Sequence, residues 1–464
     1  MRAHIQKIFT ILIITMNLFS MTSRATNQLE MQSMLDSVDK THQKFTHEFY
    51  RDLLKKPAYK NDKYASMSSL LKQLNSAQEI KNIALIVNNI DMIKAYYDDP
   101  IIFIFIKQLL EMNAYNAAKD LINEVLKQGD SSSAIHANFL LADFYFQRRQ
   151  WKKTLQKLST DINFLDNSQY HYALLMKGIS YQKINEHLQA SKAYEKIPIN
   201  SGYYNSSQLN LALANLRQGW WTDGHIIIEQ QLKKQKKKPH ETTLNRLYIT
   251  LAYSLLNQGY YRSARSTFHQ IGIESQYANQ AILGIALTAA QQDDDIGALN
   301  ATRYLKKQKQ DELAVHESHL LMPFFYEKSN QLVAASSGYN QATEYYKKEI
   351  AKLQNIINAP LDLSQYAINE SNYLTVSFAN TTIDFKPEYP VYYFKSRAML
   401  EKYRPYIKHS TSQNKYNELT EIYQQSTSKM GKEILRTRVD NLTSYLNQSR
   451  YGLARLFDNN TAEQ

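Results

Sequence analysis

A repeated pattern of residue types over residues 100–342 most constrains what this chain can fold into. In the full pattern a small or apolar residue is followed seven positions later by a turn residue, five positions after that by a small residue, and four positions after that by an aromatic or aliphatic residue. The clearest copy is Ala252, Gly259, Ala264 and Phe268. A repeat of about 34 residues predicts stacked helix–turn–helix units, an architecture typical of binding rather than catalysis. The seven copies start at Ile106, Ala142, Gly178, Ala212, Ala252, Ala286 and Pro323.

The residue types in the repeat have physical reasons. Small residues on both helices let paired helices approach closely, and the turn glycines Gly219 and Gly259 can adopt the positive φ that ends a helix. Two copies depart from the pattern. Thr154 stands where alanine is expected, and Pro323 lies within a first helix, which predicts a kink or a shifted helix start.

The segments around the repeats complete the predicted organisation. Residues 26–99 have helical patterns that fit the repeat poorly, and we expect an N-terminal helical cap, because the first unit of a stack must cover an apolar face. The array itself is expected to span residues 100–358.

The last third of the chain changes character. Residues 359–391 form an irregular linker in which the β-branched run 374–378 could be an ordered loop, a short strand or a segment laid across another surface. Helices are predicted again in residues 392–464, and one apolar stripe predicts a long helix over 419–457.

The first 25 residues are typical of a secretory signal. A basic start containing Arg2 and Lys7 precedes an apolar run of about 12 residues, and small residues lead to a predicted cleavage after Ala25. A membrane-spanning helix needs about 20 residues, so cleavage is favoured over the alternative, an uncleaved N-terminal anchor in an inner membrane. The predicted location is therefore periplasmic or secreted.

The chain contains no cysteine. This excludes a disulfide framework, thiolate chemistry, a cysteine-based metal site and a lipid anchor on a mature N-terminal cysteine. Stability must come from packing, for which 43% apolar residues provide material.

Positive charge is concentrated in two runs. The net charge is +12, and it falls to +9 without the predicted signal. Both runs follow second helices, where a solvated loop between repeats is expected, and the alternative is a patch that contacts anionic phospholipid head groups. Export argues against nucleic acid as a partner. The runs are Lys233, Lys234, Lys236, Lys237 and Lys238, and then Lys306, Lys307 and Lys309.

No segment matches an enzyme signature. His316 and His319 are three residues apart, whereas a zinc protease helix needs four, and no third ligand is suggested. The acidic run 293–295 lies at a turn, where acidic residues cap the next helix. Trp220 and Trp221 could stack on sugars, but Trp221 holds the aromatic turn position, so core packing is expected for it and exposure for Trp220. We predict no catalytic residue, metal or cofactor.

The repeated units resemble the tetratricopeptide repeat (TPR) family over residues 100–342, about half the chain. The best-matched stretches are Gly178, Tyr181, Ala190, Tyr194 and Pro198, and then Ala252, Gly259, Tyr260, Tyr261, Ala264 and Phe268. Residues 445–456 also look like the end of exported bacterial TPR proteins of unassigned role. The resemblance implies an all-α, right-handed TPR-like solenoid with a concave groove lined by first helices.

By repeat position, the resemblance gives twelve candidate groove residues on four first helices. Some family members hold a carboxylate with Lys and Asn there, whereas these positions are mostly apolar, which puts that activity in doubt. A long exposed apolar groove would promote aggregation, so we expect it to be occupied by a partner, by residues 361–390 or by the C-terminal helix. The residues are Phe139, Asp143, Phe146, Tyr172, Leu175, Ile179, Leu209, Leu213, Leu216, Ile249, Tyr253 and Leu256.

Two functions from different classes follow. The first is a non-catalytic scaffold of a bacterial cell envelope that binds partner proteins through the TPR groove. The alternative is an accessory factor of polysaccharide assembly or secretion, which would bind an acidic polymer through basic and tryptophan surfaces. The sequence leaves the oligomeric state open.

Overall fold

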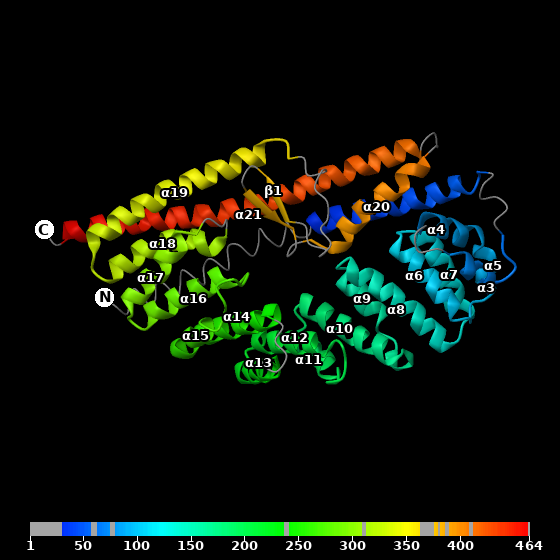
Figure 1. Cartoon of the computed structure of the whole chain (residues 1–464), viewed down its shortest axis with the longest axis horizontal. Helices are drawn as coiled ribbons and strands as arrows, with labels where there is room; N and C mark the ends of the chain where they lie inside the picture. Colours follow the sequence, from blue (N-terminus) through cyan, green and yellow to red (C-terminus); the bar gives the residue numbers. More distant parts are fainter. Residues whose placement is uncertain are drawn as a thin grey trace. The chain divides into compact units, whose positions relative to one another are not determined.

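The computed structural model describes residues 30–56, 63–74, 79–235, 241–308, 312–361, 375–378, 381–385, 389–407 and 412–462. These residues are almost entirely helical (Figure 1), which confirms the all-α class. The predicted signal lies outside the described residues. The described residues form two compact units: unit 1 contains those within Met1–Leu140, Asp362–Val376 and Asp384–Lys432, and unit 2 contains those within Leu141–Leu361, Ser377–Ile383 and Glu433–Gln464.

Unit 1 contains the N-terminal helices, the first repeat and α20. The apolar run at 101–106 opens α6, and Ile102, Phe105 and Ile106 are buried. Asn89 separates α4 from α5. The helices are residues 30–53, α3 (Met67–Gln73), α4 (Glu79–Asn88), α5 (Ile90–Lys94), α6 (Ile101–Glu111), α7 (Tyr115–Gln128) and α20 (Val391–Ile407).

Aromatic side chains join helix 30–53 to α20 and to the start of α21 (Gln413–Ala462). The rings of Phe45 and Phe49 lie edge-on to Tyr403, with centroids 5.4 and 4.9 Å away. His42 Nδ1 and the Tyr423 hydroxyl are 2.8 Å apart in a hydrogen bond. Burial of such rings is among the largest apolar contributions that a small helical core can have.

These helices also cover the turn of the first repeat. The Thr46 hydroxyl donates to the Asn113 carbonyl at 2.8 Å, the Asn113 amide donates to Ser396 Oγ at 2.8 Å, and the Tyr403 hydroxyl donates to the Met112 carbonyl at 3.2 Å. Asn113 is 1% exposed. Helix 30–53 and α20 therefore cover the turn of the first repeat, and the expected N-terminal cap over residues 26–99 stays a prediction.

Unit 2 contains the stacked helix pairs. From α9 to α19, α-helices that follow each other in the chain pack against each other, and α8 (Ser131–Gln147) continues from unit 1 into unit 2. The remaining elements are α9 (Trp151–Lys157), the 3-10 helix η1 (Ile162–Phe164), α10 (Asn167–Lys183), α11 (His187–Glu195), α12 (Tyr204–Arg217), α13 (Trp221–Gln235), α14 (Glu241–Asn257), α15 (Tyr261–Phe268), α16 (Ala278–Gln291), α17 (Asp295–Lys306), α18 (Leu313–Lys328) and α19 (Leu332–Asn358).

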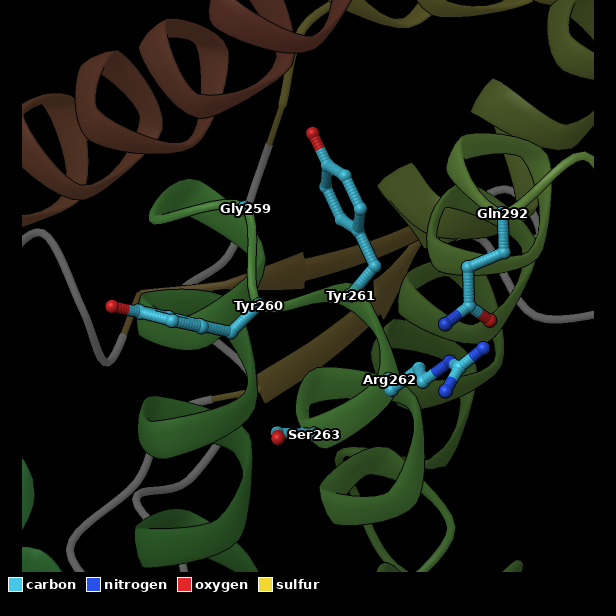
Figure 2. A pocket seen from close by; sticks show the side chains of 6 residues that line it. All are labelled: Gly259, Tyr260, Tyr261, Arg262, Ser263 and Gln292. Carbon is cyan, nitrogen blue, oxygen red and sulfur yellow. The ribbon is translucent and has the colours of Figure 1, made fainter.

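The predicted turn position has a positive φ in every repeat. Gly219 and Gly259 have φ of 80° and 81°, and Figure 2 shows Gly259 leading from α14 through Tyr260 into α15. This left-handed residue ends each first helix and reverses the chain. Asparagine serves in three other repeats because it tolerates this conformation better than most residues. The non-glycine turn residues are Asn113, Arg149, Asn185, Asp293 and Asn330.

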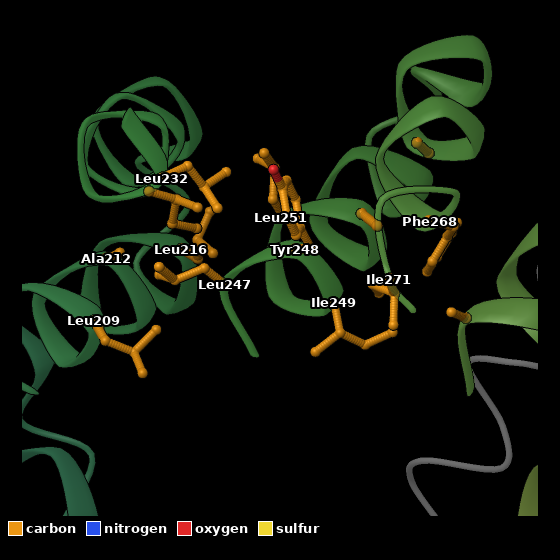
Figure 3. Close-up of a cluster of buried hydrophobic side chains, with 14 residues drawn as sticks. Leu209, Ala212, Leu216, Leu232, Leu247, Tyr248, Ile249, Leu251, Phe268 and Ile271 are labelled. Atoms are coloured by element: carbon orange, nitrogen blue, oxygen red, sulfur yellow. The ribbon is translucent and has the colours of Figure 1, made fainter. Parts of the chain in front are cut away.

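The other repeat positions are buried as the pattern predicts. Thr154 is fully buried in place of alanine, and Thr302 is fully buried where the pattern expects an apolar residue. Each threonine hydroxyl donates to a carbonyl of its own helix, Gln150 O and Ala298 O respectively, which makes the polar group compatible with burial. Figure 3 shows one resulting core cluster around α12, α14 and α15.

Large rings and glycines are matched across neighbouring helices. A Cβ placed on Gly178 would overlap the ring of Tyr194, and one placed on Gly284 would overlap the ring of Phe268. Both rings are fully buried. The absence of a side chain on each glycine therefore lets an α-helix approach an aromatic ring directly.

The C-terminal part of α21 continues the stack after the seventh repeat. In the fifth repeat, Phe268 packs against Gly284 on the first helix of the next pair; in the seventh, Tyr339 packs against Gly452 of α21, whose Cβ would lie 2.5 Å from the ring. Arg455 of α21 also donates to both carboxylate oxygens of Glu327, at 2.8 and 2.6 Å. The last turns of α21 thus take the place of a following first helix.

Two further expectations are resolved in this part of the chain. The β-branched run forms strand β1 (Thr375–Phe378), which pairs with β2 (Thr381–Asp384), so the short-strand alternative is confirmed. Helix α18 continues through Pro323 from Leu313 to Lys328, so of the two alternatives, a kink or a shifted start, the shifted start is wrong. Gly338 on α19 gives Pro323 room, since a Cβ there would lie 2.8 Å from the proline Cβ.

Asp294 caps α17, as predicted for the acidic run, and its removal is expected to destabilise the chain by about 1 kcal/mol at neutral pH. Its Oδ1 accepts from Gly297 N at 2.8 Å, and its Oδ2 lies 2.7 Å from an Arg265 nitrogen. The backbone hydrogen bond first, and Arg265 second, hold the pKa of the Asp294 carboxyl below its usual range. A lowered folded pKa means stabilisation that is present above the unfolded pKa and is lost as the pH falls through the folded pKa.

Thermal unfolding of Asp294→Ala at a series of pH values checks this prediction. The difference from the parent chain should be largest near pH 7 and should shrink as the pH drops below the unfolded aspartate value of about 3.9. Glu186→Ala is the matched control, because Glu186 is the N-cap of α11 but makes no side-chain cap hydrogen bond. A difference independent of pH would show that Asp294 acts through something other than its charge.

Candidate partner-binding surface

The structure places the twelve predicted groove residues on the first helices α8, α10, α12 and α14. Eleven belong to unit 2, and Phe139 lies in the part of α8 that belongs to unit 1. Five of them are buried, at 7–9% exposed: Phe139, Leu175, Leu209, Leu216 and Ile249. Seven are half-buried: Asp143, Phe146, Tyr172, Ile179, Leu213, Tyr253 and Leu256. Their role in partner binding stays a prediction.

Three of the half-buried residues lie together on α8 and α10. The Tyr172 hydroxyl donates to Asp143 Oδ1 at 2.8 Å, and the ring of Tyr172 lies edge-on to Phe146 with centroids 6.4 Å apart. Tyr203, just before α12, stacks on Tyr172 at 5.3 Å, and Gln147 Nε2 donates to Asp143 at 3.2 Å. We name these five residues the Asp143 cluster.

The surroundings of the Tyr172 hydroxyl keep that group protonated. Burial first, and the neighbouring carboxylate of Asp143 second, raise the pKa of the Tyr172 hydroxyl well above its usual value. The hydroxyl therefore stays protonated and remains the donor to Asp143 at physiological pH. The cluster presents one carboxylate surrounded by three aromatic rings.

Sequence reasoning missed two members of this cluster. Gln147 lies four residues after Asp143 and hence on the same helix face, a spacing that could have identified it. Tyr203 is the residue before α12, and the repeat positions gave no signal for it because it precedes the first helix of its unit.

The leucine-rich part of the predicted set belongs to the core between repeats. Leu209, Leu216 and Ile249 are members of the cluster in Figure 3, and Leu213, Tyr253 and Leu256 pack against it. Tyr253 also donates its hydroxyl to the Gln280 carbonyl at 2.9 Å on the next first helix. These side chains stabilise the stacking of α12, α14 and α16.

The two spaced histidines lie in a buried cluster between α18, α19 and α21. His316 Nδ1 is 2.7 Å from the Tyr345 hydroxyl, and His319 stacks on the same ring at 3.6 Å. Burial first, and the nearby Lys306 ammonium second, lower the pKa of His319 to about 3. Glu317, between the histidines, accepts from the Tyr445 hydroxyl at 3.3 Å. Over the residues that the structure describes, no group of three or more His, Asp or Glu side chains could hold a metal.

The turns of unit 2 carry exposed apolar side chains that sequence reasoning only partly foresaw. Trp220 is 44% exposed, as expected, but Trp221 is 37% exposed, so the prediction of core packing for Trp221 is wrong. Trp221 opens α13, and its indole nitrogen lies 3.9 Å from the Cβ position of Gly219, so the ring lies over the turn instead of between helices. Tyr261 lies over Gly259 in the same way.

A shallow pocket of ≈ 310 Å³ lies beside one of these turns. Figure 2 shows its lining from two consecutive repeats, with Tyr260 and Tyr261 pointing in different directions. Tyr260 is 61% exposed. The pocket is lined by Gly259, Tyr260, Tyr261, Arg262, Ser263 and Gln292.

The lysine runs lie at the opposite ends of the second helices. Lys233, Lys234 and Lys307 are exposed and Lys306 is half-buried. The other members, Lys236, Lys237, Lys238 and Lys309, lie outside the described residues. Among the helices that the structure describes, none is long and apolar enough to span a membrane.

Comparisons with known proteins give similarities at low sequence identity. No family model matches the chain, and no curated protein matches it. The apo form of RapI is similar with a TM-score of 0.45 and 11% identity, over 84% of this chain and 98% of that one.

Two further solved structures contain the repeat named above. One is a signal transduction ATPase with numerous domains from Pyrococcus horikoshii that has a tetratricopeptide repeat sensor; its TM-score is 0.39 at 15% identity, over 65% of this chain and 53% of that one. The other is the TPR domain of P58(IPK), with a TM-score of 0.21 at 13% identity, over 72% of this chain and 92% of that one. The TPR-like character of the array rests on its own turns and repeat positions.

Proposed function

We propose that this chain is a non-catalytic scaffold that binds a partner protein through the first-helix face of its TPR-like array. The Asp143 cluster carries the proposal, because it gathers a carboxylate and three rings from three consecutive repeats at one half-buried place. Such a place can receive one side chain of a partner between helices that the core holds rigidly.

The chemistry of the cluster indicates the kind of side chain it receives. A carboxylate bordered by aromatic faces favours a lysine ammonium or an arginine guanidinium, which can pair with the carboxylate and lie against a ring. We therefore propose a partner segment that combines a basic residue with apolar neighbours. The half-buried Ile179, one helical turn beyond Leu175 on α10, supplies apolar contact for such a segment.

A comparison of partner capture by the wild-type chain and by the Asp143→Asn variant tests the proposal. Asparagine keeps an acceptor for the Tyr172 hydroxyl but removes the negative charge, so the cluster should stay folded and lose a charged contact. Proteins crosslinked to the wild-type chain in cell-envelope extract and quantified by mass spectrometry should include one whose capture falls about tenfold with Asp143→Asn.

Asp223→Asn is the matched control, since Asp223 is an exposed carboxylate on the second helix α13. Capture by this variant should equal that of the wild-type chain. Identical capture by all three chains would refute the role of the Asp143 cluster.

The location belongs to the same proposal. The sequence of the first 25 residues supports export to the periplasm or beyond, and an uncleaved anchor in an inner membrane is the alternative. N-terminal sequencing of the protein from envelope fractions distinguishes a start at Thr26 from a start at Met1.

The second candidate function is an accessory role in polysaccharide assembly, in which the exposed lysines at the end of α13 bind an acidic polymer. Lys234 lies 4.6 Å from the ring centre of Tyr204, which orders one member of this group. Electrostatic binding of this kind should weaken steeply as salt rises, whereas partner binding through apolar contact should persist. Binding measured at two salt concentrations therefore separates the two functions.

A further inference from the structure

The turns of unit 2 share one edge of the helix stack and carry a row of exposed apolar side chains. In a stack of antiparallel helix pairs, the turns within pairs lie along one edge and the loops between pairs lie along the other. Six large apolar residues occupy the turn edge over five consecutive repeats, at 37–87% exposed. We name them the turn-edge ridge: Leu188, Trp220, Trp221, Tyr260, Ile296 and Val333.

We propose that the turn-edge ridge is a self-association surface through which two copies of this chain bind each other. Single exposed apolar residues are ordinary, but a contiguous row of them on a monomer usually marks an interaction site. A stable interface buries about 800 Å² per partner, for which a ridge along five repeats offers sufficient length.

In the first repeat, other helices of the chain bury the turn. There, the turn residues Met112, Asn113 and Ala114 are 6%, 1% and 4% exposed, because helix 30–53 and α20 cover them in unit 1. Trp220 and Tyr260 take the position of Ala114 in the fourth and fifth repeats, where they are 44% and 61% exposed. A second protein surface could cover these exposed side chains as helix 30–53 and α20 cover the first turn.

The shape of the edge suits contact between identical surfaces. An interface with two-fold symmetry needs a protrusion and a recess on the same face, since each copy presents both. The ridge side chains protrude, and the ≈ 310 Å³ pocket lined by Tyr260 and Gln292 lies beside them (Figure 2). Ile296 and Val333, at 75% and 87% exposed, are the most open ridge members, and aliphatic side chains lack the flat face on which a sugar would stack.

The charges at the turn edge permit contact between two copies. The turn edge carries both signs, so identical surfaces can meet without net repulsion: Arg217, Arg262 and Lys328 with Glu186, Asp223 and Asp293. The loop edge also exposes Ile199 and Ile273, with exposed acids such as Glu195 and Glu274 beside them and exposed bases at the ends of α13 and α17. Those bases are Lys233, Lys234, Arg303 and Lys307.

Sedimentation velocity of the full chain, over about 1 to 100 µM, tests the proposal. The wild-type chain should show a monomer–dimer equilibrium in this range. The triple variant Tyr260→Ser, Ile296→Ser and Val333→Ser should weaken the dimer at least about tenfold, as expected when central apolar anchors are removed. The control triple variant Ile199→Ser, Ile273→Ser and Leu313→Ser changes exposed residues of the loop edge and should dimerise like the wild type.

Two results would overturn the self-association proposal. A wild-type chain that stays monomeric at the highest concentration overturns it, and so does a ridge variant that still dimerises with wild-type strength. If circular dichroism shows that the triple ridge variant is misfolded, Val333→Ser alone replaces it, because a side chain 87% exposed contributes little to the fold. The partner-binding experiment on Asp143 uses a different surface, so failure of one proposal leaves the other intact.

Discussion

Replacing Phe268 with alanine is expected to lower the free energy of unfolding by about 3–5 kcal/mol, the largest effect of any substitution proposed for this chain. Phe268 is fully buried at the end of α15. Its ring lies edge-on to Tyr253 at 5.0 Å and directly over Gly284 of the next repeat. Removing the ring leaves a cavity between two repeats that rigid helices cannot close.

Chemical denaturation of the parent chain and of Phe268→Ala measures this difference. Tyr260→Ala is the matched control, because Tyr260 is an aromatic residue of the same repeat that is 61% exposed, and its loss should change stability by less than about 0.5 kcal/mol. A loss for Phe268→Ala near that of the control would show that the ring is not a packing element between repeats.

A size exchange distinguishes packing from other contributions of Phe268. Gly284→Ala alone should destabilise, because its Cβ overlaps the ring. In combination with Phe268→Leu, which makes room, the loss should be smaller than the sum of the two single losses. Additive losses would mean that these two residues do not press on each other.

The sequence predicted the repeat because a local conformation forces the residue type there. A first helix must end in a left-handed residue, and Gly219, Gly259 and Asn185 are among the residues that adopt this conformation at low cost. The buried small positions follow the same logic, since the distance between paired helices leaves room for little more than a methyl group. These constraints act within one repeat, and a single repeat is enough to display them.

The Asp143 cluster was harder to predict because its residues come from different repeats. Asp143 and Tyr172 meet only when two units stack, and Tyr203 joins them from a third. The positions of Leu209 and Ile249 matched the expected groove, yet neighbouring helices bury both. Repeat position fixes the helix face, but the packing of adjacent repeats decides how much of that face solvent reaches.

Trp221, at the turn edge, is another residue whose exposure the repeat position did not predict. The pattern identified an aromatic turn position, and aromatic residues are most often buried, so the core was the expected place. The ring instead lies over the turn made by Gly219. Whether a residue at the start of a second helix points between repeats or over the turn depends on the side-chain rotamer, which the repeat pattern does not specify.

Replacing Gly452 with leucine is expected to lower the free energy of unfolding of unit 2 by about 1–3 kcal/mol and to loosen the end of α21. The new Cβ would lie 2.5 Å from the buried ring of Tyr339, whose hydroxyl is held by Glu327 at 2.8 Å. Leucine favours a helix over glycine by up to about 1 kcal/mol, so a net loss can arise only from the steric conflict. The Arg455–Glu327 pair would be strained in the same movement.

Hydrogen exchange locates the change and separates it from general destabilisation. Amides of residues 445–456 should lose protection in Gly452→Leu, while those of helix 30–53 in unit 1 should keep theirs. Gly202→Leu is the matched control, because no atom lies within 4 Å of the Cβ position at Gly202. Full protection of residues 445–456 in Gly452→Leu would mean that α21 does not dock on Tyr339. The array would then lack the helix that completes its last repeat, and the apolar face of α19 would need another cover.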